Sequence, residues 1–343
     1  MQHSEKRSLA GRVGWVLMAS ALSLALSACS TPPTRAIPEP EILSAPDGVR
    51  FEMRYFYGQD GTRLFRQAWL PESQTKGVLI VVPGLKDHGG RYTDLGQQLA
   101  KEGFAVFLPD LRGHGHSSGP RQAIDNFNDY LVDLAVMVRQ TRKQLPGTPT
   151  FLLGHDMGGL IAARFVETVP NAVQGLAVSG APLAIKDSKY KLFGLKVLSK
   201  IAPSSTAMSP EFKDYSQDPV VAQSLQNDPL VTPNGVPAKT RALQVEATRL
   251  LQEQQERLKL PVLVMHGISD QLYPLFGSIA FYDAIPSDNK GLKQYPGMSH
   301  DLWREPGNSD VAADLSDWMN GLLIRQRSAK RKELAASAEP GNN

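Results

Sequence analysis

The sequence contains a single cysteine, at position 29, among its 343 residues. One cysteine excludes a disulfide framework, a cysteine-rich zinc site and an iron–sulfur cluster. The formal net charge is only +3, from 37 basic and 34 acidic residues, which is too small to indicate nucleic-acid binding. The apolar run at residues 13–26 is shorter than the roughly 20 residues that a membrane-spanning helix needs. What remains is the composition of a globular protein, with 41% hydrophobic residues.

The first thirty residues have the pattern of a secretory signal, in which basic residues precede a short apolar run. That run ends in Leu-Ser-Ala-Cys at positions 26–29, which resembles the lipobox of bacterial lipoproteins. The resemblance implies a lipoprotein signal peptide over residues 1–28, cleavage before Cys29 and lipidation of Cys29. Several acyl chains would anchor the protein to a membrane almost permanently. The alternative is an ordinary signal peptide cut near Ala28, with Cys29 left as a free thiol.

The segments that flank the globular part predict a location and a tether. Ser30 follows the cysteine, and a residue other than aspartate there resembles outer-membrane sorting, so we expect a lipid anchor in the bacterial cell envelope, on the outer membrane facing the periplasm. Residues 29–48 are rich in proline and predict an extended tether. Residues 326–343 form a polar tail, either a frayed helix end or a basic contact with anionic headgroups.

The middle of the chain, residues 49–325, alternates short apolar β-branched runs with stretches of helical periodicity. Eight strands separated by helices predict a mostly parallel, doubly wound α/β sheet. The expected strands are 49–56, 63–70, 77–82, 104–108, 150–153, 173–178, 261–266 and 291–295, and the expected helices are 92–102, 126–144, 157–169, 275–285 and 311–324. Residues 184–259 interrupt the alternation and predict a helical cap above the carboxyl ends of the strands, where ligands bind in such sheets.

The segment after the fifth strand carries the strongest chemical signal. Residues 154–159 read Gly-His-Asp-Met-Gly-Gly between a strand and a helix, which is the layout of a nucleophile elbow with Asp156 in the place of the usual serine. A carboxylate there would also benefit from the helix dipole. The alternative is an aspartate that only caps the helix. Asp270 follows the seventh strand and His300 the eighth, so nucleophile, acid and histidine stand in the chain order of α/β-hydrolases.

Several separated motifs, spread over about residues 50–322, resemble the monoacylglycerol lipase and lysophospholipase group of α/β-hydrolases. They are Val82-Pro83-Gly84, Asp87 to Tyr92, Pro109 to Ser117, Leu152 to Gly159 and the segments that end in Asp270 and His300. The resemblance implies an α/β-hydrolase fold of eight strands with a helical cap insertion. It also implies an oxyanion hole made by the backbone N–H groups of Leu85 and Met157. By the same resemblance, His88 and Arg91 are structural loop residues.

An aspartate at the elbow changes the chemistry that this site can perform. Attack of a carboxylate on an ester carbonyl gives a high-energy mixed anhydride, whereas attack on saturated carbon gives an alkyl ester that an Asp270–His300 pair can hydrolyse by activating water. Epoxide hydrolases and haloalkane dehalogenases, which resemble this chain in fold, use that route. Tyr190 and Tyr215 of the predicted cap are candidates to protonate an opening epoxide oxygen. Met157 stands where dehalogenases usually have tryptophan, which favours epoxide opening over dehalogenation.

Three hypotheses therefore stay open. The preferred one is a membrane-anchored hydrolase of a hydrophobic, lipid-like substrate, with Asp156 as nucleophile and epoxide-hydrolase-type chemistry. The second is a monoacylglycerol lipase- or lysophospholipase-like carboxylic ester hydrolase, and the third is a catalytically silent lipid-binding or scaffold lipoprotein. The sequence contains no H-E-x-x-H metal motif and no dinucleotide or phosphate loop, so we expect neither metal nor cofactor. We expect no nucleic-acid partner, and the sequence predicts no oligomeric state.

Overall fold

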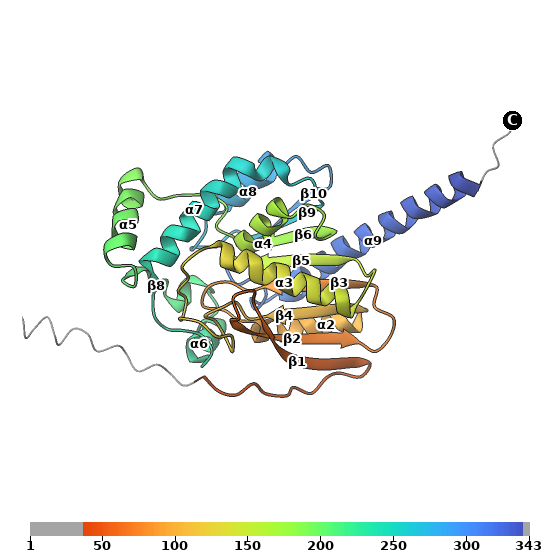
Figure 1. Ribbon diagram of the computed structural model, residues 1–343, viewed down its shortest axis with the longest axis horizontal. Coiled ribbons are helices and arrows are strands. Elements are labelled where there is room, and N and C mark those ends of the chain that lie inside the picture. Colours follow the sequence, from red (N-terminus) through yellow and green to blue (C-terminus); the bar gives the residue numbers. More distant parts are fainter. Residues whose placement is uncertain (1–36, 339–343) are drawn as a thin grey trace, which may run out of the picture. The chain divides into compact units, whose positions relative to one another are not determined.

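The computed structural model of the protein describes residues 37–338 (Figure 1). The described residues all belong to one compact unit. The predicted signal peptide, Cys29 and Ser30 lie outside the described residues.

Eight strands form one mixed sheet in the order β1-β2-β4-β3-β5-β6-β9-β10. Strand β2 pairs with β1 and with β4 in antiparallel fashion, and the other five pairs of neighbours are parallel. The strands are β1 Val49–Tyr57, β2 Arg63–Pro71, β3 Gly77–Val82, β4 Phe104–Pro109, β5 Thr150–His155, β6 Gly175–Ser179, β9 Val262–Gly267 and β10 Lys290–Tyr295. This arrangement confirms the predicted α/β-hydrolase fold with a mostly parallel eight-stranded sheet.

Helices cover both faces of the sheet, and the apolar residues of each strand alternate between the two cores. In β3, Val78, Ile80 and Val82 pack with α3 (Asn128–Gln144), α4 (Met157–Thr168) and α8 (Leu275–Ala284). Leu79 and Val81 point to the other face, which is covered by α2 (Thr93–Lys101) and α9 (Asn308–Ala338). Burial on both faces explains why these strands read as continuous apolar runs.

The helix predicted at residues 311–324 is longer in the structure, where α9 runs from Asn308 to Ala338. Its core contacts end near Leu323, and Ile324 is already exposed. The residues beyond are mostly Arg, Lys, Glu, Ala and Ser, and most of these are good helix formers that can continue a helix without packing. Hydrophobic periodicity alone therefore placed the end too early.

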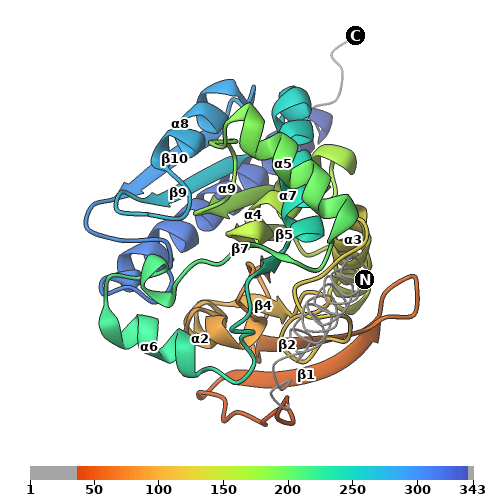
Figure 2. The ribbon, with the colours of Figure 1, turned by 90° about the vertical axis from the view of Figure 1, so that its left-hand side faces the viewer.

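Residues 184–259, called the insertion below, connect β6 to β9. They contain α5 (Lys189–Ile201), α6 (Pro219–Asn227) and α7 (Ala238–Gln254), the short helices η3 (Phe212–Asp214) and η4 (Gln255–Arg257), and a small ladder between β7 (Thr206–Met208) and β8 (Val236–Pro237). Figure 2 shows α5 alongside α7, in agreement with their packing contacts. No helix within residues 37–338 is long and apolar enough to span a membrane.

Candidate active site

Asp156 lies at a sharp turn between β5 and α4. Its backbone has φ 51° and ψ −129°, a conformation that non-glycine residues rarely adopt. Neighbouring glycines make the turn possible, because a Cβ on Gly154 would lie 2.3 Å from the carbonyl oxygen of Gly158, and one on Gly158 would lie 2.0 Å from that of Val82. The backbone geometry of a nucleophile elbow is therefore present, with a carboxylate at its tip.

Gly158→Ala is expected to destabilise the protein by about 3 kcal/mol or more, because the new methyl group would collide with the backbone of β3. Chemical denaturation measures this free energy. The matched control is Gly194→Ala in α5, where no atom lies within 4 Å of the added Cβ. That change should stabilise by about 0.5–1 kcal/mol, since alanine favours a helix over glycine. Equal effects of the two substitutions would contradict the packing described for the elbow.

The Asp156 carboxylate is buried, and its two oxygens have different surroundings. The backbone N–H of Leu85 donates a hydrogen bond to Oδ2 at 2.9 Å. Oδ1 has no hydrogen bond of ordinary geometry within the described residues, although the Tyr273 hydroxyl is near enough to lower the pKa of this group. The charge of His300 and the hydrogen bond from Leu85 also lower this pKa. Burial outweighs all three effects and raises the pKa of Asp156 to about 6. One expected oxyanion donor is thus occupied by the aspartate itself.

Gly84 makes the contact between Leu85 and Asp156 possible. A Cβ at this position would lie 2.4 Å from Asp156 Oδ2. The Pro83-Gly84 pair therefore provides the close backbone approach. Met157, the second expected donor, is fully buried at the first position of α4.

His300 and Asp270 form a buried pair at the ends of neighbouring strands. Asp270 Oδ2 lies 2.9 Å from His300 Nδ1, and the backbone N–H groups of Leu272 and Tyr273 donate to Oδ1, which fixes the carboxylate. Burial opposes protonation of His300, but the charges of Asp270 and Asp156 prevail and raise its pKa to about 9. His300 Nε2 is buried without a hydrogen-bond partner in residues 37–338. At neutral pH the site therefore holds an ionised Asp156 and a protonated His300.

Two tyrosines complete the site. The ring of Tyr215, from the insertion, lies 5.4 Å from that of His300, and the ring of Tyr273 lies 5.6 Å from it. Both hydroxyl groups have raised pKa values because of burial and the charge of Asp156. Tyr215 was a sequence candidate, whereas Tyr273 was missed because no local pattern marks it. The interpretation of Tyr190 as a site residue is wrong, since it lies on α5 with 90% of its surface exposed.

Ion pairs and a buried lysine hold the insertion against the loop after β3. His88 Nε2 lies 2.9 Å and Arg91 Nη1 lies 3.7 Å from Asp228 Oδ2 of the insertion, and Arg91 Nη2 also pairs with Asp301, outside the insertion, at 3.2 Å. These contacts agree with structural roles for His88 and Arg91. Lys86 has φ 47°, and its Nζ donates to the carbonyl oxygens of Pro210 and Pro233 at 3.3 and 3.4 Å. The insertion is therefore docked beside the Leu85 donor.

The space at Asp156 is small. A cavity of about 10 Å³ lies between Leu85, Asp156, Tyr215 and Leu225. That volume holds about one water molecule. A molecule larger than water therefore fits beside Asp156 only if the residues that line this cavity move.

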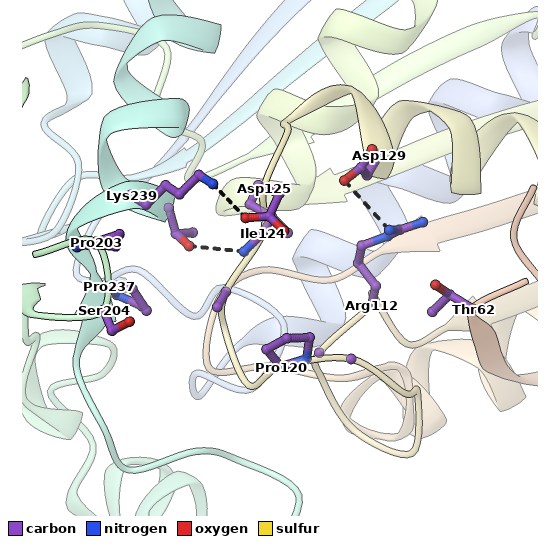
Figure 3. A pocket seen from close by; sticks show the side chains of 14 residues that line it. Thr62, Arg112, Pro120, Ile124, Asp125, Asp129, Pro203, Ser204, Pro237 and Lys239 are labelled. Carbon is purple, nitrogen blue, oxygen red and sulfur yellow. Dashed lines mark hydrogen bonds and ion pairs between the residues drawn. The ribbon is translucent and has the colours of Figure 1, made fainter. Parts of the chain in front are cut away.

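Larger cavities lie elsewhere along the insertion, and two of them are compared with the candidate site. One of about 330 Å³ is lined by residues 184–187, parts of α7 and Tyr273, and so lies next to the site. The other, of about 280 Å³, is shown in Figure 3, where Lys239 pairs with Asp125 and Arg112 lies 3.7 Å from Asp129. Asp156, Asp270 and His300 do not line this second cavity, so it is separate from the candidate site. Within residues 37–338 no group of three His, Cys, Asp or Glu side chains is placed to hold a metal ion.

Comparison with known proteins identifies the family. Residues 73–307 match the family described as serine aminopeptidase, S33. The chain is 30% identical over 266 residues to a monoacylglycerol lipase from Mycolicibacterium smegmatis, covering 77% of this chain and 95% of that protein. It is 29% identical to the human monoglyceride lipase, with 74% and 85% of the two chains covered.

A solved structure agrees with these sequence matches. The crystal structure of the monoacylglycerol lipase from Paleococcus ferrophilus is similar with a TM-score of 0.67 and 26% identity, covering 76% of this chain and 98% of that one. The chain therefore belongs to the serine aminopeptidase S33 family and is a monoacylglycerol lipase-like α/β-hydrolase.

Proposed function

We propose that the protein hydrolyses a carboxylic ester of a lipid-like substrate, by direct attack of water and without an acyl-enzyme. The family relationship supports the substrate class, because the relatives include monoacylglycerol and monoglyceride lipases. The observation that carries the mechanism is the pair Asp156 and His300, whose pKa values of about 6 and about 9 lie on either side of neutrality. Groups whose environments separate their pKa values in this way are suited to act as base and acid.

In this mechanism Asp156 acts as a general base toward water, whereas a serine at this position would act as a nucleophile. Oδ1 accepts a proton from a water molecule, and the resulting hydroxide attacks the ester carbonyl. The tetrahedral intermediate then expels the alcohol, and His300 donates a proton to the leaving oxygen. Asp270 orients His300 and stabilises its protonated form. The rate should be modest, because Asp156 Oδ2 occupies the Leu85 N–H that would otherwise stabilise the oxyanion.

The rate of ester hydrolysis is expected to follow a bell-shaped pH profile with limbs near pH 6 and pH 9. Below the first limb Asp156 is protonated and accepts no proton, and above the second His300 is neutral and donates none. In Asp156→Asn the pKa of His300 should fall below 9, since one of the anions that raise it is gone. NMR titration of the His300 ring tests this directly, and an unchanged pKa would contradict the coupling between the two groups.

A second candidate, epoxide opening, is favoured by the different surroundings of the two Asp156 oxygens. With Oδ2 held by Leu85, Oδ1 can attack an epoxide carbon while Tyr215 or Tyr273 protonates the opening oxygen. The resulting alkyl ester removes the negative charge that helps to keep His300 protonated, and His300 transfers its proton to the tyrosinate that epoxide opening leaves. His300 can then accept a proton from water and hydrolyse the ester.

A single turnover in H₂¹⁸O separates the two candidates. Direct attack on an ester places ¹⁸O in the released fatty acid. The alkyl-enzyme route transfers an Asp156 oxygen to the diol and leaves ¹⁸O in Asp156, which peptide mass spectrometry detects. Long-chain monoacylglycerols and epoxides of the same chain length are the matched substrates. Turnover of neither, with retained binding of both, would support the catalytically silent lipid-binding protein instead.

We further propose that Cys29 is lipidated and holds the mature protein on the outer membrane, facing the periplasm. The support is the Leu-Ser-Ala-Cys sequence at residues 26–29 and the serine that follows it. Labelling with palmitate should modify the native protein but not Cys29→Ser. Recovery of the native protein with inner-membrane fractions would contradict the sorting part of this proposal.

A further inference from the structure

Within residues 37–338, Arg66 of β2 is a buried cation that forms no ion pair with an acidic side chain, and only 4% of its surface is exposed. Its Nη2 donates a hydrogen bond to Gln144 Oε1 at 3.0 Å, whereas Nη1 has no hydrogen-bond partner in the same part of the chain. The guanidinium carbon lies 4.9 Å from the centre of the Phe107 ring. A neutral amide and an aromatic ring compensate the charge only in part, and a buried charge without an opposite partner is costly.

A second arginine lies directly opposite the first. Arg54 of β1 is the antiparallel partner of Arg66, so both side chains lie on the same face of the sheet, where like charges destabilise the pair. Glu52 lies on this face as well, but it already pairs with Arg50 at 2.8 Å and with Arg54 at 3.6 Å. Burial lowers the pKa of Arg66 to about 10, the charge of Arg54 acts in the same direction, and the charge of Glu52 opposes both. The described residues therefore leave an excess of positive charge at this position.

These side chains line a groove of about 780 Å³ between β1 and α3. Four basic side chains and one acidic side chain contribute to its walls, namely Arg50, Arg54, Arg66, Lys143 and Glu52. The side chains of Arg50 and Arg54 are 62% and 63% exposed, so a molecule from solvent can reach them. Asp156, Asp270 and His300 do not line this groove, which is therefore separate from the candidate active site.

We infer that the groove between β1 and α3 binds a phosphate monoester, whose oxygens accept hydrogen bonds from Arg54 and Arg66. Guanidinium groups bind phosphate through paired, charge-assisted hydrogen bonds. A phosphate monoester carries up to two negative charges and three acceptor oxygens, so it neutralises several cations better than a carboxylate does. This inference goes beyond the proposed function and does not depend on turnover. A soluble ester and a phospholipid headgroup share this chemistry, and the experiment separates them.

The first test compares thermal unfolding of the native full chain and Arg54→Gln, both in a neutral detergent and a phosphate-free buffer. The Arg54 side chain is mostly exposed, so its replacement should leave the fold intact. Without ligand the variant should unfold about 1–3 °C higher, because the opposed charges no longer repel each other. Glycerol 3-phosphate should stabilise the native chain and not the variant, so that the order reverses. If the ligand leaves the difference between the two chains unchanged, the inference is overturned.

Isothermal titration calorimetry measures the affinity of the groove. Arg54→Gln and Arg66→Lys should each weaken glycerol 3-phosphate binding at least about tenfold, since each loses charge-assisted hydrogen bonds. Lysine at position 66 keeps the charge but not the planar pair of donors, and circular dichroism shows whether this buried variant is folded. The matched control is Arg331→Gln, which removes an exposed arginine of α9 on the opposite face and should bind as the native chain does. Equal affinities of Arg54→Gln and Arg331→Gln would overturn the inference.

Two short-chain lipids identify the source of the phosphate. Dihexanoyl phosphatidic acid presents a phosphate monoester on acyl chains, and dihexanoyl phosphatidylcholine presents the same chains without one. Binding of phosphatidic acid at least tenfold tighter than that of glycerol 3-phosphate would assign the groove to a lipid headgroup, and equal affinities would assign it to a soluble ester. The inference is overturned if phosphatidylcholine binds as tightly as phosphatidic acid, or if acetate binds as tightly as glycerol 3-phosphate.

Discussion

Asp156→Ser is expected to increase ester hydrolysis by about 10²–10⁴-fold, the usual contribution of a positioned base and nucleophile. The substitution has three effects that act in the same direction. It supplies a hydroxyl that His300 can deprotonate, and it releases the Leu85 N–H for the oxyanion. It also removes an anion that raises the pKa of His300, so that more of the imidazole is neutral at pH 7.

The control for this prediction is Asp156→Ala, which removes the carboxylate without adding a nucleophile. It should free Leu85 and lower the pKa of His300, yet give no gain in ester hydrolysis. Initial rates with a long-chain monoacylglycerol compare the three proteins. If the serine variant is folded and gains nothing, the insertion rather than the nucleophile limits catalysis, and the proposed description of the site is wrong.

His300→Gln is expected to reduce turnover by at least about 10³-fold, because both candidate reactions need a proton transfer at this residue. The two reactions fail at different points. Ester hydrolysis loses the acid that protonates the leaving alcohol, so nothing accumulates. Epoxide opening should still form the alkyl ester on Asp156 and stop there, so intact mass spectrometry should show an adduct of the mass of the epoxide.

Thermal unfolding of His300→Gln shows whether the variant is folded. This control is needed because His300 is fully buried and forms a hydrogen bond with Asp270. A folded variant that keeps its activity would exclude His300 from both mechanisms. An adduct with the epoxide but normal turnover of esters would mean that the epoxide reacts at Asp156 only as an inactivator.

The sheet was predictable because each of its central strands carries the signal locally. Residues 78–82 are continuously apolar, and the structure buries them on both faces. The order of Asp156, Asp270 and His300 along the chain was also sufficient to expect their side chains in one cleft, since each follows a strand of the sheet. The structure brings Asp270 and His300 within hydrogen-bonding distance and places Asp156 close enough to raise the pKa of His300.

Contacts between distant segments were not predictable in the same way. The hydrogen bond from Leu85 to Asp156 joins residues 71 positions apart, and no periodicity encodes it. Tyr273 enters the site because a turn after Asp270 directs its side chain inward, whereas Tyr190 faces solvent because α5 packs through its leucine side. Exposure of a cap residue depends on how the insertion docks, which a local pattern does not specify.

The backbone N–H of Asp301 donates to the carbonyl oxygen of Tyr215 at 2.9 Å, so the residue after His300 is joined to the insertion. This bond must break whenever the Tyr215 segment lifts, and the amide of Asp301 is otherwise buried. Its hydrogen–deuterium exchange should therefore report how often the site opens. The exchange rate of this single amide therefore measures the opening of the site, and the measurement needs no knowledge of the substrate.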